Sequence, residues 1–317
     1  TYFFYTALSF PFIAAYDSAA SIFRAQDNTK GPMIISMISN VMNIAGNAVM
    51  IWVFHMGVAG AALSTLISRI FCAVVVIIQL RKEREGQEIV VRDYFKIRPD
   101  WSMIRRILGL GIPSGVENSM FQLGKLAIQS TVSTLGTAAI AAQAMTNILE
   151  NLNGMAAIGV GVGLMTIVGQ CMGADRKDEA VYYIKKLSVI AEVAIIVSCL
   201  LVFALIRPVT VLGGMEPASA KMCFHMVTWI TLVKPIVWTL AFVPAYGLRA
   251  AGDVKFSMIT SCLVMWLCRF CLCVILIRFL GFGPMGVWIG MFADWTVRAV
   301  IFTWRFHSRR WLRYKVI

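Results

Sequence analysis

Residues 187–206 read LSVIAEVAIIVSCLLVFALI, a run of twenty in which Glu192 carries the sole charge. About 20 apolar residues are enough for an α-helix to cross the hydrocarbon core of a bilayer. Lipid offers no partner to backbone amides and carbonyls, whereas a helix satisfies these groups within its own segment. This stretch therefore predicts a transmembrane helix.

Apolar runs of comparable length recur along the whole chain. With the first run extended to 182–206, we expect nine spans, at 2–23, 32–54, 57–80, 104–133, 138–170, 182–206, 222–247, 256–279 and 285–306. Several are longer than a bilayer requires, which indicates tilt or extension beyond the membrane. The predicted fold class is an all-α, polytopic membrane helix bundle with about nine transmembrane helices.

The composition is typical of a protein whose solvent is lipid. Of the 317 residues, 59% are hydrophobic and only 14% are charged, and the mean hydropathy is +0.77. Soluble proteins carry about 25% charged residues. A soluble domain of this size would lack the polar residues needed to cover its surface.

Membrane topology explains the net charge of +13. The connections between the expected spans lie alternately on one side of the membrane and on the other. Of the 29 Lys and Arg, 21 fall in the connections of one side and 3 in those of the other. The positive-inside rule predicts such an asymmetry. We therefore expect residue 1 outside the cytoplasm, the C-terminus inside, and no binding of nucleic acid.

The longest and most charged connection divides the chain into two lobes. We interpret residues 82–103 as a cytosolic linker, 1–81 as the C-terminal half of a first lobe, 104–306 as a second lobe of six helices, and 307–317 as a basic cytosolic tail.

An internal repeat relates the two lobes. Two blocks match with identical internal spacing, namely Arg24-Ala25 with Asn28 and Lys30, and Arg249-Ala250 with Asp253 and Lys255. Six spans separate the copies, so both face the same way, an arrangement used by secondary transporters. Three helices in front of residue 1 would complete the first lobe, and we expect the chain to be a fragment that lacks them.

The ordered short motifs resemble the multidrug and toxic compound extrusion (MATE) transporters over nearly the whole chain. The second lobe carries Gly109-x-Gly111-Ile112-Pro113, Ala141-Ala142-Gln143 and Val168-Gly169-Gln170, and the first lobe carries Ile22-x-Arg24-Ala25, Asn40-x-x-Asn43 and Gly57-Val58-x-Gly60-Ala61-Ala62. The resemblance identifies the first three spans with helices four to six of that family.

The resemblance implies two lobes around a central cavity, and export of organic cations or drugs in exchange for H⁺ or Na⁺ by alternating access. It implies a small cationic or amphipathic substrate, a bilayer partner and no further cofactor. Lipid-linked sugar flippases share the broad fold and remain the alternative, because a fold alone does not define a substrate. We expect a monomer in the inner membrane of a bacterium.

Acidic side chains inside spans are the candidates for ion coupling, because such charges are costly in lipid. Glu117 is the first choice: it follows Pro113 by about one turn, and the family has a cation-binding Glu on this helix, although in another register. Pairing of Glu117 with Lys125 or with a helix-end group is the structural alternative. Glu150 is a second candidate, favoured more as a cavity-lining residue than as an ion ligand.

Asp294 is the third coupling candidate, although its i, i+4 spacing to Arg298 favours a simple ion pair. Polar residues on helix faces are expected either to line the cavity or to bond neighbouring helices. The cavity-lining candidates are Asn147, Asn151, Gln143, Asn40, Asn43, Asn47 and Asp17. The candidates for hinges or close packing are Pro113, Gly159, Gly161 and Gly163.

No pattern in the sequence predicts an enzyme, a bound metal or ATP hydrolysis. His55, His225 and His307 lie far apart, and no phosphate-binding Gly-Lys motif follows a strand. A membrane enzyme would call for clustered His and acidic residues near one interface.

Overall fold

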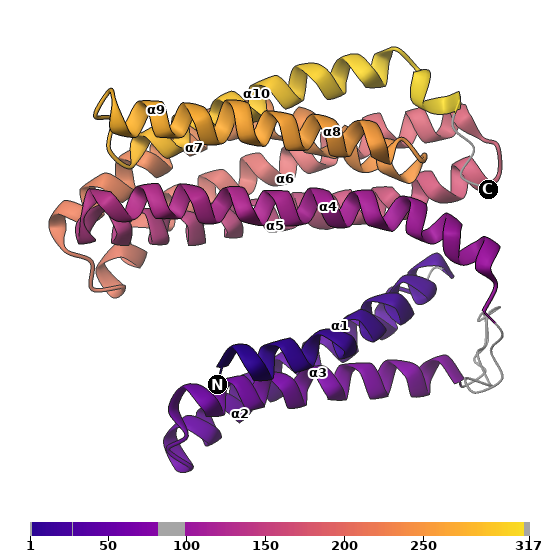
Figure 1. Cartoon of the computed structure of the whole chain (residues 1–317), viewed down its shortest axis with the longest axis horizontal. Coiled ribbons are helices and arrows are strands. Elements are labelled where there is room, and N and C mark those ends of the chain that lie inside the picture. The colour runs from indigo at the N-terminus through magenta and orange to yellow at the C-terminus, as the bar shows by residue number, and fades with distance from the viewer. Residues whose placement is uncertain (1, 27, 82–98, 314–317) are drawn as a thin grey trace. The chain divides into compact units, whose positions relative to one another are not determined.

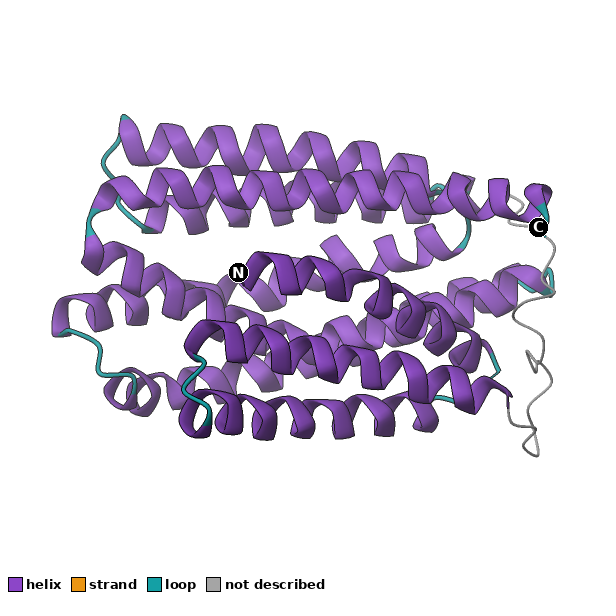
Figure 2. Ribbon diagram, turned by 60° about the horizontal axis from the view of Figure 1, so that its bottom comes forward, coloured by secondary structure: helices purple, strands orange, loops and turns teal. Residues whose placement is uncertain are grey.

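The structure, a computed structural model, describes residues 2–26, 28–81 and 99–313. Two compact units divide it, Thr1–Pro99 and Asp100–Ile317. Figure 2 shows helices joined by short loops, with no strand among the described residues. Most of the predicted linker 82–103, and the end of the tail 307–317, lie outside the described residues, so these domain boundaries stay predictions.

The first unit holds α1 (Tyr2–Ala25), α2 (Lys30–Ala48) and α3 (Gly57–Arg81). A π-helical segment, Val49–Val53, continues α2. Both α1 and α2 pack along α3 and hardly touch each other. A small core of Phe23, Ile35 and Val76 joins the three helices.

The second unit holds seven helices, and Figure 1 shows them running side by side. They are α4 (Trp101–Val132), α5 (Thr137–Gly173), α6 (Lys177–Leu212), α7 (Pro217–Ala250), α8 (Val254–Val264), α9 (Leu272–Arg278) and α10 (Met285–His307). A π-helical segment, Met265–Cys271, joins α8 to α9, so these three pieces form one continuous rod.

Local sequence accounts for several helix ends. The Asp100 carboxylate caps α4 by accepting hydrogen bonds from the Ser102 and Met103 amides at 2.9 and 3.3 Å. Asp178 and Glu179 occupy the first turn of α6, where the helix dipole favours negative charge. Pro217 begins α7, a position that needs no amide hydrogen.

The turn after α7 has the same hydrogen bond as its counterpart in the repeat. Gly252 adopts a φ of 93°, and the Asp253 amide donates to the Leu248 carbonyl at 2.9 Å, which is a Schellman ending. In the first unit, the Asn28 amide donates to the Phe23 carbonyl at 3.0 Å. The two bonds occupy equivalent positions of the sequence repeat.

The helical rods follow the predicted runs closely. Within the residues that the structure describes, seven of them are long and apolar enough to cross a membrane, and the all-α membrane fold is confirmed. The others, α1 and α4, are more polar, because α1 carries Asp17 and α4 carries Glu117, Asn118 and Gln122. The number of crossings therefore stays a prediction. With 37 residues, α5 is about 55 Å long, more than a bilayer requires.

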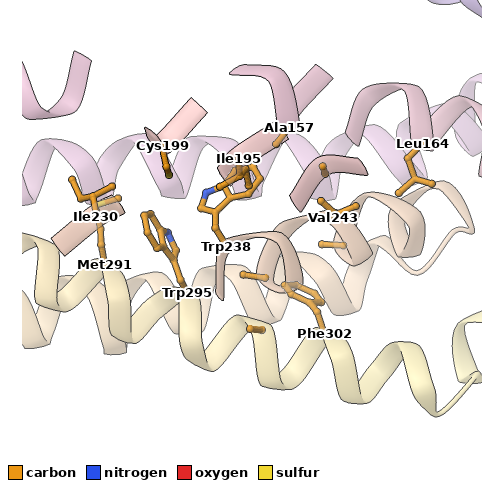
Figure 3. Close-up of a cluster of buried hydrophobic side chains, with 14 of the residues drawn as sticks. Ala157, Leu164, Ile195, Cys199, Ile230, Trp238, Val243, Met291, Trp295 and Phe302 are labelled. Atoms are coloured by element: carbon orange, nitrogen blue, oxygen red, sulfur yellow. The ribbon is translucent and has the colours of Figure 1, made fainter. Parts of the chain in front are cut away.

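The main core lies where α5, α6, α7 and α10 meet. Fully buried alanines, Ala157, Ala191 and Ala241, allow these helices to approach closely. Trp238 of α7 and Trp295 of α10 fill the space between them (Figure 3). Large apolar side chains that remain exposed are numerous on the outer faces of the helices, which suits contact with lipid.

Candidate functional site

The interior of the second unit contains three ion pairs whose acids are the three coupling candidates. Each acid binds one basic side chain, and two of these pairs join different helices. Charged groups are costly inside a membrane and are retained there when they pair or serve transport. We therefore regard this interior as the candidate site.

Glu150 of α5 pairs with Lys234 of α7. The Lys234 ammonium lies 2.6 Å from Glu150 Oε1 and donates a second hydrogen bond, at 3.0 Å, to the Glu150 backbone carbonyl. Its side chain is 0% exposed, and the rings of Trp238 and Trp295 lie 5.5 and 5.9 Å away. The sequence marks Glu150 as a candidate, but it offers no means of finding a partner on a distant helix.

Glu117 of α4 pairs with Arg249 at the end of α7. The two side chains are 10% and 25% exposed, and Arg249 Nη2 lies 2.5 Å from Glu117 Oε1. Of the two predicted alternative partners, Lys125 is wrong, because it lies two turns farther along α4, whereas the helix-end group is confirmed, because Arg249 lies in the last turn of α7. The other carboxylate oxygen of Glu117 is buried and has no hydrogen-bond partner among the described residues.

The Schellman turn at Gly252 positions two ion pairs at this end of the bundle. Arg249, in the last turn of α7, pairs with Glu117, and the turn that follows brings Asp253 to Arg305 of α10, whose Nε lies 2.8 Å from Asp253 Oδ2. One short turn thus connects α7 to both α4 and α10.

Asp294 pairs with Arg298 one turn along α10, at 2.8 Å, as its spacing predicts. Both side chains are almost completely buried, and Arg298 also donates to the Ser261 carbonyl of α8 at 3.0 Å. These contacts give Asp294 a structural role between α10 and α8.

A cavity of about 180 Å³ lies beside the Glu150–Lys234 pair. Its walls are mostly aromatic or apolar, and they include two further cations. The lining residues are Phe121, Lys125, Glu150, Asn151, Gly154, Ile158, Trp238, Phe242, Tyr246, Arg269, Met291 and Trp295. Of the predicted cavity-lining residues, Asn151 is in this wall together with Glu150. Arg269 is absent from the predicted site residues, although a basic residue within a predicted span is a sufficient signal of one.

Two other candidates on α5 lie elsewhere. Gln143 is 3% exposed and accepts a hydrogen bond from the Trp288 indole at 3.0 Å. It therefore serves packing between α5 and α10, and does not line this cavity. Asn147 is half-buried one turn before the cavity wall.

In the first unit, the predicted asparagine seam is partly used for helix packing. Asn43 Nδ2 donates to Thr65 Oγ1 of α3 at 3.2 Å, and Asn47 donates to Asn43 at 3.2 Å. Asn40 and Asp17 are exposed. The role of these residues in a substrate cavity stays a prediction.

A larger apolar groove of about 960 Å³ lies between the starts of α7 and α10. Methionine and aromatic side chains dominate its walls, which suits adaptable binding of apolar molecules. It is lined by Ala218, Lys221, Met222, His225, Met226, Trp229, Val233, Phe282, Pro284, Met285, Ile289 and Phe292.

The hinge and packing candidates have different environments. Helix α4 continues through Pro113, which is buried. A Cβ added to Gly161 would lie 2.5 Å from the Tyr246 ring, whereas one added to Gly159 or Gly163 would meet nothing within 4 Å. Gly161 is thus a packing position, at which α7 approaches α5.

Replacement of Gly161 by alanine is expected to destabilise the protein by about 1–3 kcal/mol, because the added methyl group forces Tyr246 to move. Thermal unfolding of the purified protein in detergent measures this. Gly159→Ala and Gly163→Ala are the matched controls, and they should leave the melting temperature unchanged or slightly higher, since alanine favours the helix. Equal effects at the three positions would contradict the packing role.

The fold and its buried ion pairs define a polytopic helical membrane protein, and comparison with known proteins identifies the family. The MatE family model matches residues 113–275, more than half of the chain, and the chain belongs to the MATE family. The model for the lipid II flippase MurJ matches residues 1–104.

Relatives and solved structures agree with this assignment. The chain is 26% identical to "Probable multidrug resistance protein NorM" of Thermotoga maritima, over 94% of this chain and 64% of the relative. It is 24% identical to "Uncharacterized transporter YisQ" of Bacillus subtilis, over 93% and 65%. A crystal structure of MATE in complex with MaL6 shares the fold, with a TM-score of 0.80, 18% identity, and coverage of 94% and 66%. The chain therefore spans less than two thirds of the length of these curated relatives.

Proposed function

We propose that this chain belongs to a secondary active exporter that moves organic cations or drugs across a membrane in exchange for H⁺ or Na⁺. Its membership of the MATE family and the carboxylates held inside its helix bundle support this proposal. Coupling to an ion gradient needs a buried group whose charge changes when the ion binds. Alternating access of two lobes would expose that group to each side in turn.

Glu117 is the coupling carboxylate that the geometry favours. One of its oxygens holds Arg249, while the other is buried and has no hydrogen-bond partner among the described residues, so it can accept a proton or ligate Na⁺. Because the pair joins α4 to α7, a change of charge on Glu117 would weaken a contact between two helices. Asp294 Oδ2 is likewise buried without a hydrogen-bond partner among the described residues, but Asp294 is less suitable, since its ion pair joins two residues of one helix.

The flippase alternative has one observation in its favour, the match of the MurJ model to residues 1–104. The drug exporter is preferred because the match of the MatE model, residues 113–275, includes the coupling candidate Glu117. In addition, the relatives in Thermotoga and Bacillus carry multidrug-resistance or transporter names.

We further propose the inner membrane of a bacterium as the location, with residue 1 outside and the C-terminus in the cytoplasm, and a monomeric transporter. The alternation of Lys and Arg supports this orientation. A cysteine placed at the exposed Arg310 should react with a membrane-impermeant maleimide in broken cells but not in intact ones. Equal labelling in intact and broken cells would place the C-terminus outside the cytoplasm and contradict the proposed orientation.

The full-length protein reconstituted in vesicles tests the function. We expect an imposed H⁺ or Na⁺ gradient to drive efflux of a cationic dye, and the matching ionophore to abolish it. Transport of a labelled lipid-linked sugar without any dye efflux would favour the flippase instead.

A further inference from the structure

Arg269 is a buried guanidinium that no carboxylate of the described residues pairs with. It lies in the π-helical segment Met265–Cys271 and is 7% exposed. Its Nε has no hydrogen-bond partner within the described part of the chain. Burying an unpaired charge is expensive, and π-helical segments inside α-helices are frequent at functional sites. Such a group indicates a ligand that supplies the missing negative charge.

A second cation lies beside Arg269. Lys125 also lines the cavity and makes no ion pair among the described residues. The Lys125 ammonium and the Arg269 guanidinium each lie 5.3 Å from the centre of the Phe121 ring. Two positive groups thus face the same small volume from α4 and from the π-helical segment.

The acids nearest Arg269 are each bound to another basic side chain. Glu150 is the sole acid in the lining, and Lys234 lies 2.6 Å from its carboxylate. Asp294, on α10, binds Arg298 at 2.8 Å. The interior around Arg269 therefore keeps an excess of positive charge.

The volume of the cavity and the side chains that line it indicate which kind of anion it can bind. A volume of about 180 Å³ is below the range of about 300–1,000 Å³ usual for pockets that hold a whole drug, and it is close to the volume of about 150 Å³ of a cavity that accepts a benzene ring. Trp238, Trp295 and Met291 supply an apolar wall, and Figure 3 shows all three within the core between α7 and α10. The cavity therefore suits one aromatic end of a larger molecule.

We propose that this cavity is an anion-accepting subsite that binds an aromatic carboxylate, with Arg269 as its main hydrogen-bond donor and Lys125 as a second positive charge. A planar guanidinium pairs with a carboxylate through two parallel hydrogen bonds. The proposal rests on the proposed export function, and it adds to that function a binding subsite for an aromatic carboxylate.

Calorimetric titration of the full-length protein in detergent tests this subsite. The probes are 2-naphthoate, its uncharged amide 2-naphthamide, and the cation 2-naphthylmethylammonium. We expect the wild-type protein to bind naphthoate at least about tenfold more tightly than the other two, the ratio that one charge-assisted hydrogen bond supplies. Equal binding of naphthoate and naphthamide would overturn the proposal.

Variants of two arginines on the same rod locate the effect. Arg269→Gln should weaken naphthoate binding about tenfold and leave naphthamide unchanged, whereas Arg278→Gln, at an exposed site, should change neither. Arg269→Lys keeps the charge but loses the planar fork, and should give an intermediate affinity. If Arg269→Gln does not fold, Lys125→Gln and Arg269→Lys make the same test. Unchanged naphthoate affinity in the folded variants would refute the subsite.

Dye efflux from the same preparation separates this proposal from the export function. If the protein shows gradient-driven efflux of the cationic dye but does not bind naphthoate, the subsite is refuted and the export function is supported. If the protein binds naphthoate in a way that depends on Arg269 but shows no gradient-driven efflux, the subsite is supported and the proposal of coupled export is refuted.

Discussion

Replacement of Lys234 by methionine is expected to destabilise the second unit by about 3–5 kcal/mol, the cost of leaving a buried charge without its partner. The Lys234 side chain is 0% exposed and makes both of its hydrogen bonds to Glu150. Methionine fills a similar volume but leaves the Glu150 carboxylate without its ammonium partner. The variant should therefore unfold at a markedly lower temperature or denaturant concentration in detergent.

Two further variants separate the loss of charge pairing from the loss of a side chain. Lys221→Met removes an exposed lysine from the same helix and should have little effect. The double variant Lys234→Met/Glu150→Leu removes both charges and should recover most of the lost stability, since an apolar pair can replace a buried ion pair. If the double variant is as unstable as Lys234→Met, the ion pair is not the source of the effect.

The positions of the helices could be predicted from the sequence, because lipid imposes one simple requirement on every span. The run 104–133 corresponds to Trp101–Val132, and the run 285–306 to Met285–His307. The Asp294–Arg298 pair was also predictable, since a helix brings i and i+4 together whatever the tertiary structure.

Contacts between helices could not be predicted, because they depend on the rotation of each helix about its axis. The sequence marks Glu117 as a candidate, but nothing in it points to Arg249 as the partner. Gln143, a predicted cavity residue, accepts a hydrogen bond from the Trp288 indole instead. A polar residue on a helix face can bond a neighbouring helix as readily as it can line a cavity. Arg269 lies in a π-helical segment, for which the sequence offers no periodic signal.

Replacement of Glu117 by glutamine is expected to uncouple transport from the ion gradient. Glutamine keeps the shape of the side chain and can still bond Arg249, but it cannot change charge when H⁺ or Na⁺ arrives. A coupling free energy of about 1–3 kcal/mol corresponds to about a 5- to 150-fold effect, so gradient-driven accumulation should fall by about that factor. Downhill exchange of the same dye should persist, because neither lobe has lost its packing.

The measurement compares uphill and downhill dye transport by the full-length protein in vesicles, with and without an H⁺ or a Na⁺ gradient. Glu192→Gln is the matched control, since Glu192 is a half-buried acid on α6 outside the ion pairs described above, and its transport should equal the wild type. If Glu117→Gln still concentrates dye as the wild type does, Glu117 is not the coupling group. Loss of both uphill and downhill transport would indicate instead that Glu117 and Arg249 are needed to hold α4 against α7, because a coupling residue alone does not limit passive exchange.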